Sequence, residues 1–202
     1  MATTIDLLRH GALLGGIRYR GSTQAALSDS GRAAMDAVWA QLCGDVVSAI
    51  VSSPLSRCSE PATAWAQAAN IPCNIVDDLR EMHYGAWEGL TATDIERQFP
   101  NMLQRWRENP LGMHIPGAET VESFAARVIK AWQGILAAAE GKHILLVAHS
   151  GTLRVILAHV LAAPLVTTRR VAMPYASWSR VAMDNGQCRL VYLNWNVDKN
   201  LI

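Results

Sequence analysis

Five side chains that could handle a phosphoryl group lie where apolar segments of this sequence give way to loops. Arg9 and His10 follow an apolar run near the N-terminus, and His149 follows a second one. Arg57 and Glu81 lie at similar junctions between them. Sheets in α/β proteins present their ligand sites at strand ends, so we expect the five side chains to meet at one edge of a sheet.

The types of these side chains favour phosphoryl transfer. Arginine holds phosphate oxygens through paired hydrogen bonds, so we expect Arg9 and Arg57 to bind the group, with His149 as a further donor. Neutral imidazole can attack phosphorus, and the nearby arginines keep His10 neutral because they disfavour another positive charge. Glu81 can protonate the departing oxygen and then deprotonate the attacking water, which predicts a bell-shaped pH profile.

The same side chains are a poor set for a metal ion. Guanidinium is not a normal metal ligand, and the sequence has neither HExxH nor paired-carboxylate spacing. Arginines can supply the positive charge that magnesium supplies in other phosphoryl-transfer enzymes. We therefore predict a reaction that uses no metal and no other cofactor.

Alternating strand and helix signals predict a three-layer α/β sandwich, with a mostly parallel central sheet flanked by helices. Strands are expected over residues 3–9, 49–52, 73–76, 144–148, 177–183 and 188–193, the last two joined by an Asn-Gly turn. Helices are expected from the N-cap Ser28 to Gly44, from Pro54 to about residue 69, and over residues 91–98, 120–140 and 151–162.

A stretch punctuated by prolines, residues 91–118, interrupts this alternation. We interpret it as a small helical cap that contains Trp106. The sequence has no internal repeat, linker or low-complexity segment, so we expect one domain over residues 1–202. The apolar hairpin near the C-terminus could pair with a second copy, which leaves a homodimer as an open expectation.

Composition argues against several classes of partner. Half of the 202 residues are hydrophobic, 17% are charged, and the formal net charge is +1 without a block of like charges, so we expect no nucleic-acid partner. No apolar run is long enough to span a bilayer, so we expect no membrane partner either. The partner that we expect is a small-molecule phosphomonoester. We also expect a cytoplasmic location, because the scattered cysteines are typical of free thiols in a reducing compartment; they are Cys43, Cys58, Cys73 and Cys188.

Four segments, in order along nearly the whole chain, resemble the histidine phosphatase superfamily, which includes the cofactor-dependent phosphoglycerate mutases. They are Leu-Arg-His-Gly at 8–11, Ser-Pro-Leu-Ser-Arg-Cys at 53–58, Leu-Arg-Glu at 79–81 with Tyr-Gly-Ala-Trp-Glu-Gly at 84–89, and Val-Ala-His-Ser-Gly at 147–151. The resemblance implies a phosphoglycerate mutase-like fold and a phosphohistidine intermediate on His10. It also implies a phosphate pocket of Arg9, Arg57 and His149, with Glu81 as the proton donor.

Within this family, residues 19–23 and 27–31 resemble the bacterial α-ribazole-5′-phosphate phosphatases, which act late in assembling the lower ligand of cobalamin. The substrate that this implies is α-ribazole 5′-phosphate or adenosylcobalamin 5′-phosphate. The alternative is a broad-specificity phosphatase for sugar phosphates and other small molecules. A pocket that grips mainly the phosphate discriminates weakly among leaving groups.

The loop after the Arg-His-Gly tripeptide departs from the family pattern. Ala12, Leu13 and Gly16 stand where the family commonly has an acidic residue, a threonine and an asparagine. The polar contacts to the phosphate from this loop are either lost or supplied instead by Ser22 and Thr23, which we expect to bind substrate.

Three further residues are expected to contact substrate. Ser150 and Gly151 begin a helix, and the amides at a helix N-terminus favour an anion. Tyr84 is expected at the rim of the site. Together with Trp87 and Trp106 it is expected to pack the cap against the body of the domain. The alternative is that one of these three rings stacks on a planar base such as a benzimidazole.

Other polar residues have plainer interpretations. Arg18 and Arg20 lie in a glycine-rich loop, where solvated surface is the default and steering of the phosphate is the alternative. The position of Glu81 in the family motif favours it over four nearby acids: Asp77, Asp78, Glu88 and Glu96. The remaining histidines are expected to be structural or on the surface: His83, His114, His143 and His159.

Two other functions remain as hypotheses. A mutase would return the phosphoryl group to another oxygen of the substrate, but mutases of this family tend to be longer and to carry an extended lid. The short interval between Arg57 and Glu81 leaves little room for such a lid. A degenerate member would bind phosphorylated ligands without turnover, and the intact set of five side chains argues against it.

Overall fold

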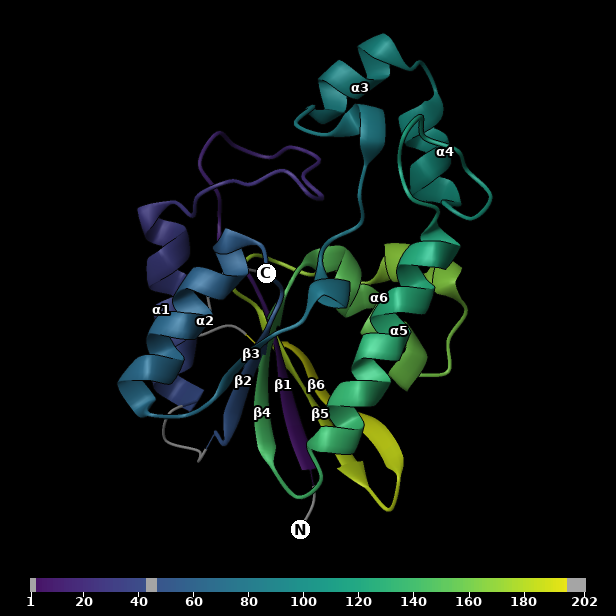
Figure 1. Cartoon of the computed structure of the whole chain (residues 1–202). Coiled ribbons are helices and arrows are strands. Elements are labelled where there is room, and N and C mark those ends of the chain that lie inside the picture. The colour runs from purple at the N-terminus through teal and green to yellow at the C-terminus, as the bar shows by residue number, and fades with distance from the viewer. Residues whose placement is uncertain (1–2, 43–46, 196–202) are drawn as a thin grey trace.

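Six strands form one sheet in the order β3-β2-β4-β1-β5-β6 in the computed structural model, which describes residues 3–42 and 47–195 (Figure 1). β4 pairs in parallel with β1 and β2, and β2 with β3, whereas β5 is antiparallel to both β1 and β6. The expected, mostly parallel sheet is therefore confirmed. The strands are β1 (Thr3–Arg9), β2 (Ala49–Ser52), β3 (Cys73–Ile75), β4 (His143–Ala148), β5 (Trp178–Asp184) and β6 (Gln187–Trp195).

Helices cover both faces of this sheet (Figure 1). Successive residues of β1 point to opposite faces, so Leu8 packs against one pair of helices and Leu7 against the other. All of β2 and nearly all of β4 are buried, as expected for strands covered on both sides. The three-layer sandwich is thus confirmed. One layer holds α1 (Asp29–Leu42) and α2 (Ser56–Ala69), and the other holds α5 (Val121–Ala138) and α6 (Ser150–Val160).

The starts of the first two helices show how the chain leaves the sheet. Ser28 Oγ accepts a hydrogen bond from the Gly31 amide at 3.0 Å and caps α1, as expected. The expectation that Pro54 lies in the first turn of α2 is wrong, because α2 begins at Ser56. The Ser53 amide still pairs with β4, so the chain turns away from the sheet only after it. The expected end of the first helix at Gly44 lies outside the described residues.

A helical cap lies above the carboxyl ends of the parallel strands (Figure 1). It contains α3 (Ala92–Gln98) and α4 (Met102–Glu108), and a capping box between Thr91 and Asp94 begins α3. Trp106 of α4 is buried against Trp87, which lies just before α3, with the ring centroids 6.0 Å apart. The centroid of the Trp87 ring lies 5.5 Å from that of Tyr19, in the loop after β1. Both tryptophans therefore pack the cap against the body. Three short 3-10 helices complete the described chain: η1 (Asp77–Leu79), η2 (Gly85–Trp87) and η3 (Leu165–Arg170).

β6 is an edge strand whose side chains alternate between exposed and half-buried. Val191, Leu193 and Trp195 are among the exposed ones. A homodimer through this edge stays a prediction.

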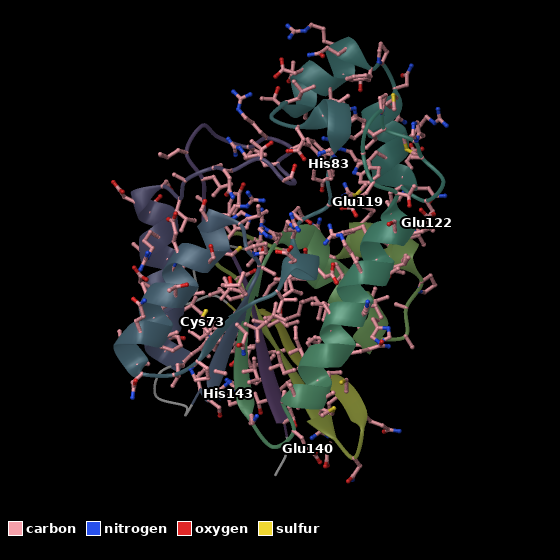
Figure 2. The ribbon with its side chains drawn as sticks, viewed as in Figure 1. Cys73, His83, Glu119, Glu122, Glu140 and His143 are labelled. Atoms are coloured by element: carbon pink, nitrogen blue, oxygen red, sulfur yellow. The ribbon has the colours of Figure 1, made fainter. Side chains whose placement is uncertain are left out.

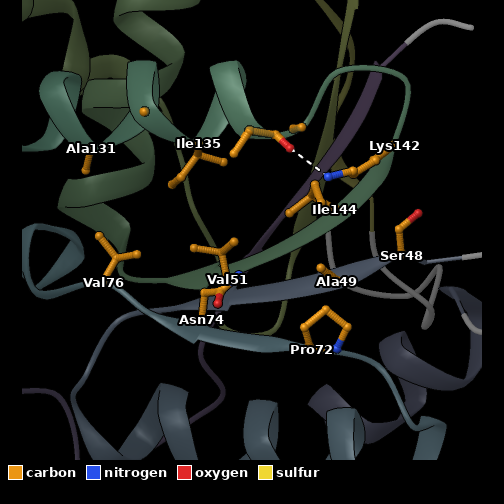
Figure 3. A pocket seen from close by; sticks show the side chains of 13 residues that line it. Ser48, Ala49, Val51, Pro72, Asn74, Val76, Ala131, Ile135, Lys142 and Ile144 are labelled. Carbon is orange, nitrogen blue, oxygen red and sulfur yellow. Dashed lines mark hydrogen bonds between the residues drawn. The ribbon is translucent and has the colours of Figure 1, made fainter.

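A cavity of about 780 Å³ lies between α5 and the β2–β3 side of the sheet (Figure 3). Its walls are mostly small apolar side chains such as Ala131 and Ile144. Lys142 is its one titratable lining residue, and its ammonium group donates to the Ala138 carbonyl at 3.0 Å. The lining of this cavity contains no histidine, carboxylate or thiol that could act in catalysis.

Within the described part of the chain, no helix is both long and apolar enough to cross a bilayer. The cysteines that the structure describes are free, as expected: Cys58 is buried, and Cys73 and Cys188 are half-buried. Cys43 lies outside the described residues.

Candidate active site

The five side chains singled out in the sequence come together at the carboxyl edge of the parallel strands. Arg9 ends β1 and His10 follows it, and His149 follows β4 as the N-cap residue of α6. Arg57 lies in the first turn of α2, after β2, and Glu81 follows η1, after β3. The parallel pairing of these strands brings the loops that follow them to one edge of the sheet.

His10 is held in a neutral state. Its Nδ1 lies 2.8 Å from the Gly11 carbonyl oxygen, which can only accept, so Nδ1 carries the proton and Nε2 keeps a lone pair. Burial lowers the pKa of His10 to about 3, and the charges of Arg9 and Arg57 add to this effect. The imidazole is therefore unprotonated across the physiological range.

His149 lies beside His10, with the ring centroids 5.3 Å apart. The Nε of Arg57 donates to His149 Nδ1 at 3.3 Å, so the proton of His149 is on Nε2, which donates to Ser53 Oγ at 2.7 Å. Burial and the Arg57 charge hold the pKa of His149 well below its usual value. Ser53 was not expected to contribute, although it begins one of the family segments.

Arg57 also organises the loop before α1. Its Nη1 donates to the Thr23 carbonyl at 2.8 Å, and its Nη2 donates to the carbonyls of Gly21 at 2.8 Å and Arg20 at 3.3 Å. With the Nε bond to His149, four of the five guanidinium N–H groups are engaged. Arg57 therefore ties the loop to the histidine pair.

Glu88 closes this loop from the other side. Its carboxylate accepts hydrogen bonds from the amides of Gly21, Ser22 and Thr23, and from the amide of Tyr84 at 2.9 Å. The Thr23 hydroxyl donates to it as well. Burial favours the neutral carboxyl, but these hydrogen bonds outweigh it and lower the pKa of Glu88. Ser22 and Thr23, expected to contact phosphate, are thus directed at Glu88 and do not line the cavity at His10.

Glu81 is fixed against the start of α6. Its Oε2 accepts from the Gly151 amide at 2.9 Å and from Ser150 Oγ at 3.4 Å, and its Oε1 accepts from the Met82 amide at 3.1 Å. A Cβ at position 151 would lie 2.3 Å from Glu81 Oε1, so only glycine allows this approach. The helix-start donors at Ser150 and Gly151 therefore hold the proposed proton donor.

Arg9 lies over an aromatic ring that the sequence did not single out. Its guanidinium carbon is 3.9 Å from the centroid of the Tyr175 ring, and the centroid of the His10 ring is 5.7 Å from the same ring. Arg9 Nη1 donates to the Met173 carbonyl, while Arg9 Nε is buried without a partner among the described residues. Burial lowers the pKa of Arg9. No sequence motif around Tyr175 could have placed it here.

A cavity of about 440 Å³ opens between these residues and the cap. Arg9, His10 and Glu81 line it, whereas Arg57 and His149 are fully buried beside it. Of the residues expected to bind substrate, Tyr84 and Ser150 also line it, and burial raises the pKa of the Tyr84 phenol.

Trp87 and Trp106 are not among the residues that line this cavity, so neither ring can stack on a base bound there. Six arginines line it, including Arg18 and Arg20, which bind carbonyls of their own loop.

The remaining histidines lie apart from this cavity, as expected. His143 is at the opposite end of the sheet, where its Nε2 lies 2.6 Å from Asp6 Oδ2 (Figure 2). His83 accepts from the Gly85 amide below the cap (Figure 2). His114 and His159 are exposed. Among the described residues, no group of three or more histidine, cysteine, aspartate or glutamate side chains could hold a metal ion.

Fold and site together define a phosphoglycerate mutase-like α/β protein, with a histidine pair at the carboxyl edge of its sheet. The chain belongs to the histidine phosphatase superfamily (branch 1), whose sequence profile matches residues 5–196. The resemblance noted in the sequence is thereby confirmed over nearly the whole chain.

The relatives of this chain include proteins named for different substrates. The bifunctional protein Rv2228c of Mycobacterium tuberculosis is 32% identical over 158 residues, which span 77% of this chain and 43% of that protein. The adenosylcobalamin/alpha-ribazole phosphatase of Salmonella typhimurium is 23% identical over 93% of this chain and 94% of its own. The native structure of a mycobacterial glucosyl-3-phosphoglycerate phosphatase has a TM-score of 0.87 at 27% identity, covering 97% of this chain and 100% of that one.

Proposed function

We propose that this protein is a metal-independent phosphomonoesterase that works through a phosphohistidine on His10. The observation that carries the proposal is the state of His10: it is neutral, its Nε2 is free of hydrogen, and it lines a cavity beside two arginines and a carboxyl group. A nucleophile, a proton donor and positive charge are the parts that phosphoryl transfer needs.

The reaction has two balanced steps. First, His10 Nε2 attacks phosphorus while the bond to the ester oxygen breaks, and Glu81 gives its proton to that oxygen. Second, a water molecule gives its proton to Glu81 and attacks phosphorus, the bond to Nε2 breaks, and phosphate leaves. Both groups then return to their starting states.

The arginines stabilise the charge on the transferring group. Arg9 lines the cavity and has a buried Nε without a partner, so it is free to donate to a phosphoryl oxygen. Arg57 has one N–H group that donates to no protein acceptor. His149 can donate to a phosphoryl oxygen only if its hydrogen bond from Nε2 to Ser53 Oγ breaks. We therefore assign the first contact to Arg9, and assign Arg57 and His149 to the wall of the phosphate pocket beside His10.

α-Ribazole 5′-phosphate, or adenosylcobalamin 5′-phosphate, is the substrate that the loop over residues 19–31 favours, and the Salmonella relative supports it. The second candidate is a broader range of small phosphomonoesters, which the open arginine-lined cavity supports. A cytoplasmic location remains a prediction.

The experiment compares phosphate release from α-ribazole 5′-phosphate and p-nitrophenyl phosphate in excess EDTA. Wild-type protein is expected to turn over at least one of them. The phosphohistidine intermediate is trapped in the same reaction by quenching in base, because phosphohistidine is acid-labile and base-stable. The His10→Ala variant should form no phosphohistidine, and its kcat should be lower by at least about 10³-fold. His159→Ala, a change at an exposed histidine, is the matched control. Robust turnover by His10→Ala would overturn the mechanism.

The role of Glu81 has its own test. Glu81→Gln keeps the size and shape of the side chain but replaces the carboxyl group by an amide, which cannot act as a proton donor at neutral pH. It should lower kcat/KM, which reports the first step, about 10²- to 10⁴-fold for an alkyl phosphate and much less for p-nitrophenyl phosphate, whose leaving group is stable as an anion. Equal losses on both substrates would remove Glu81 as the proton donor to the leaving oxygen.

A further inference from the structure

The cavity beside His10 carries more positive charge than a phosphoryl group requires. Its lining contains one carboxylate, Glu81, and six arginines: Arg9, Arg18, Arg20, Arg107, Arg154 and Arg169. The whole chain has a formal net charge of only +1, so this concentration is local. Arg9 serves the phosphoryl end. Arg18 and Arg20 donate to carbonyls of their own loop, and Arg18 donates to the Gly89 carbonyl as well, which leaves three arginines to explain.

These three, which we call the distal arginines, come from three separate elements. Arg107 lies on α4 of the cap, Arg154 on α6 and Arg169 in η3. The guanidinium carbon of Arg169 is 5.8 Å from the ring centroid of Trp106, the residue that precedes Arg107 on α4. The cap and the body therefore contribute to one group of positive charges.

Two of the distal arginines are held in position with donors to spare. Arg154 Nε donates to the Val171 carbonyl at 2.7 Å, which leaves its two terminal nitrogens for another acceptor. Arg169 Nε is buried without a hydrogen-bond partner among the described residues. A buried donor with no acceptor is costly, so it is expected to meet one in the working protein.

The described part of the protein supplies no ion-pair partner for this group, although the charge of Glu81, in the same cavity lining, raises the pKa of Arg154. No aspartate or glutamate within the described chain lies within ion-pair distance of any distal arginine, although other arginines such as Arg97 and Arg127 have such partners. Burial lowers the pKa of Arg154, and repulsion from Arg169 lowers it further. Like charges packed together without an ion-pair partner are typical of a site whose anion comes from solution.

We propose that the distal arginines form a second anion site, and that the substrate is a phosphomonoester whose alcohol carries a further anionic group, a carboxylate or a second phosphate. This inference rests on the proposed phosphatase function and narrows its substrate class. The phosphate that is removed lies at His10 and Arg9, and the retained anion lies at Arg107, Arg154 and Arg169. α-Ribazole 5′-phosphate has no second anionic group, so this inference favours the second candidate named above, other small phosphomonoesters, over α-ribazole 5′-phosphate.

The test uses pairs of substrates that differ in the second anion. 3-Phosphoglycerate is compared with glycerol 3-phosphate for the carboxylate, and fructose 1,6-bisphosphate with fructose 6-phosphate for the second phosphate. Wild-type protein should prefer the more anionic member of at least one pair by tenfold or more in kcat/KM. Which pair shows the preference identifies the second anion.

Single substitutions then locate the preference. Arg107→Gln, Arg154→Gln and Arg169→Gln should each lower the ratio of kcat/KM within the preferred pair at least fivefold. Arg105→Gln is the matched control, since Arg105 is an exposed arginine on the same helix that does not line the cavity. The inference is overturned if wild-type protein shows no preference in either pair, or if the three substitutions leave the ratio unchanged.

Failure of the phosphatase function gives a separate result. If wild-type protein releases no phosphate from any substrate, including p-nitrophenyl phosphate, the proposed function fails. The second anion site is then judged by calorimetric titration of the same protein with 3-phosphoglycerate, glycerol 3-phosphate, fructose 1,6-bisphosphate and fructose 6-phosphate. Tighter binding of the more anionic member in either pair, lost in Arg154→Gln, supports the site, and equal binding in both pairs overturns it.

Discussion

Adding one methyl group at Gly151 should slow catalysis without harming the fold. The Cβ of Gly151→Ala would lie 2.3 Å from Glu81 Oε1 and 3.1 Å from the carboxyl carbon of Glu81. The closest common carbon–oxygen approach is roughly 3.3 Å, so the carboxylate must retreat by about 1 Å. It would also lose the short hydrogen bond from the Gly151 amide. The atoms that must move are the far end of a flexible side chain, not backbone.

The size of the effect follows from this displacement. A misplacement of about 1 Å in a catalytic group costs on the order of 100-fold in rate. Position 151 has no left-handed backbone strain and lies in the first turn of α6, where alanine is favoured over glycine by about 0.5–1 kcal/mol. We therefore expect kcat for an alkyl phosphate to fall about 100-fold while Tm is unchanged or higher.

The assay pairs steady-state kinetics with a thermal melt. Gly134→Ala is the matched control, since an added Cβ at position 134 of α5 meets no atom within 4 Å. It should keep wild-type kcat and raise Tm by about 1–4 °C. A Gly151→Ala protein with wild-type kcat would refute the placement of Glu81 as proton donor. A fall in Tm together with lost activity would instead show that Gly151 supports the fold.

Three further changes test other parts of the structure. Between pH 6.5 and about 3 the unfolded chain binds a proton at His10 that the native protein does not, so the free energy of unfolding falls as pH falls. From pH 7 to pH 5, His10→Asn should lose about 2 kcal/mol less than wild type in urea titrations, and parallel pH dependences would contradict the buried neutral state. Glu88→Gln removes the carboxylate that gathers the loop held by Arg57, and kcat/KM should fall about 10- to 100-fold, with faster proteolysis within residues 20–23 as the structural readout. Asp6 is buried and bonded to Arg180 at 2.9 Å, far from His10, so Asp6→Asn should cost about 3–5 kcal/mol of stability in a denaturant titration while the protein that stays folded keeps its KM.

The chemistry of the site could be predicted because it depends on residue type at strand ends. Parallel strands place their following loops at one edge of the sheet whatever the details of packing. Knowing that Arg9, His10 and His149 each follow an apolar strand was therefore enough to bring them together. The mostly parallel order and the C-terminal hairpin follow from the same local patterns.

The roles of neighbouring residues could not be predicted, because they depend on which atoms meet across long separations. Ser22 and Thr23 were expected to contact phosphate, yet their amides meet Glu88, which comes more than sixty positions later in the chain. The tautomer of His149 depends on Arg57 and Ser53 together. Neither pairing has a signal in the local sequence.

The sequence alone determined the class of fold and the set of histidines and charged groups at the edge of the sheet, since periodicity and residue type report these directly, and it predicted His10 as the nucleophile. Only the tertiary structure decided where the remaining arginines lie. Arg107, Arg154 and Arg169 look like ordinary residues of three separate segments, and they become one site only when the cap folds over the body. Charge acts through space, so a cluster assembled from distant segments is visible in the folded chain and not in its sequence.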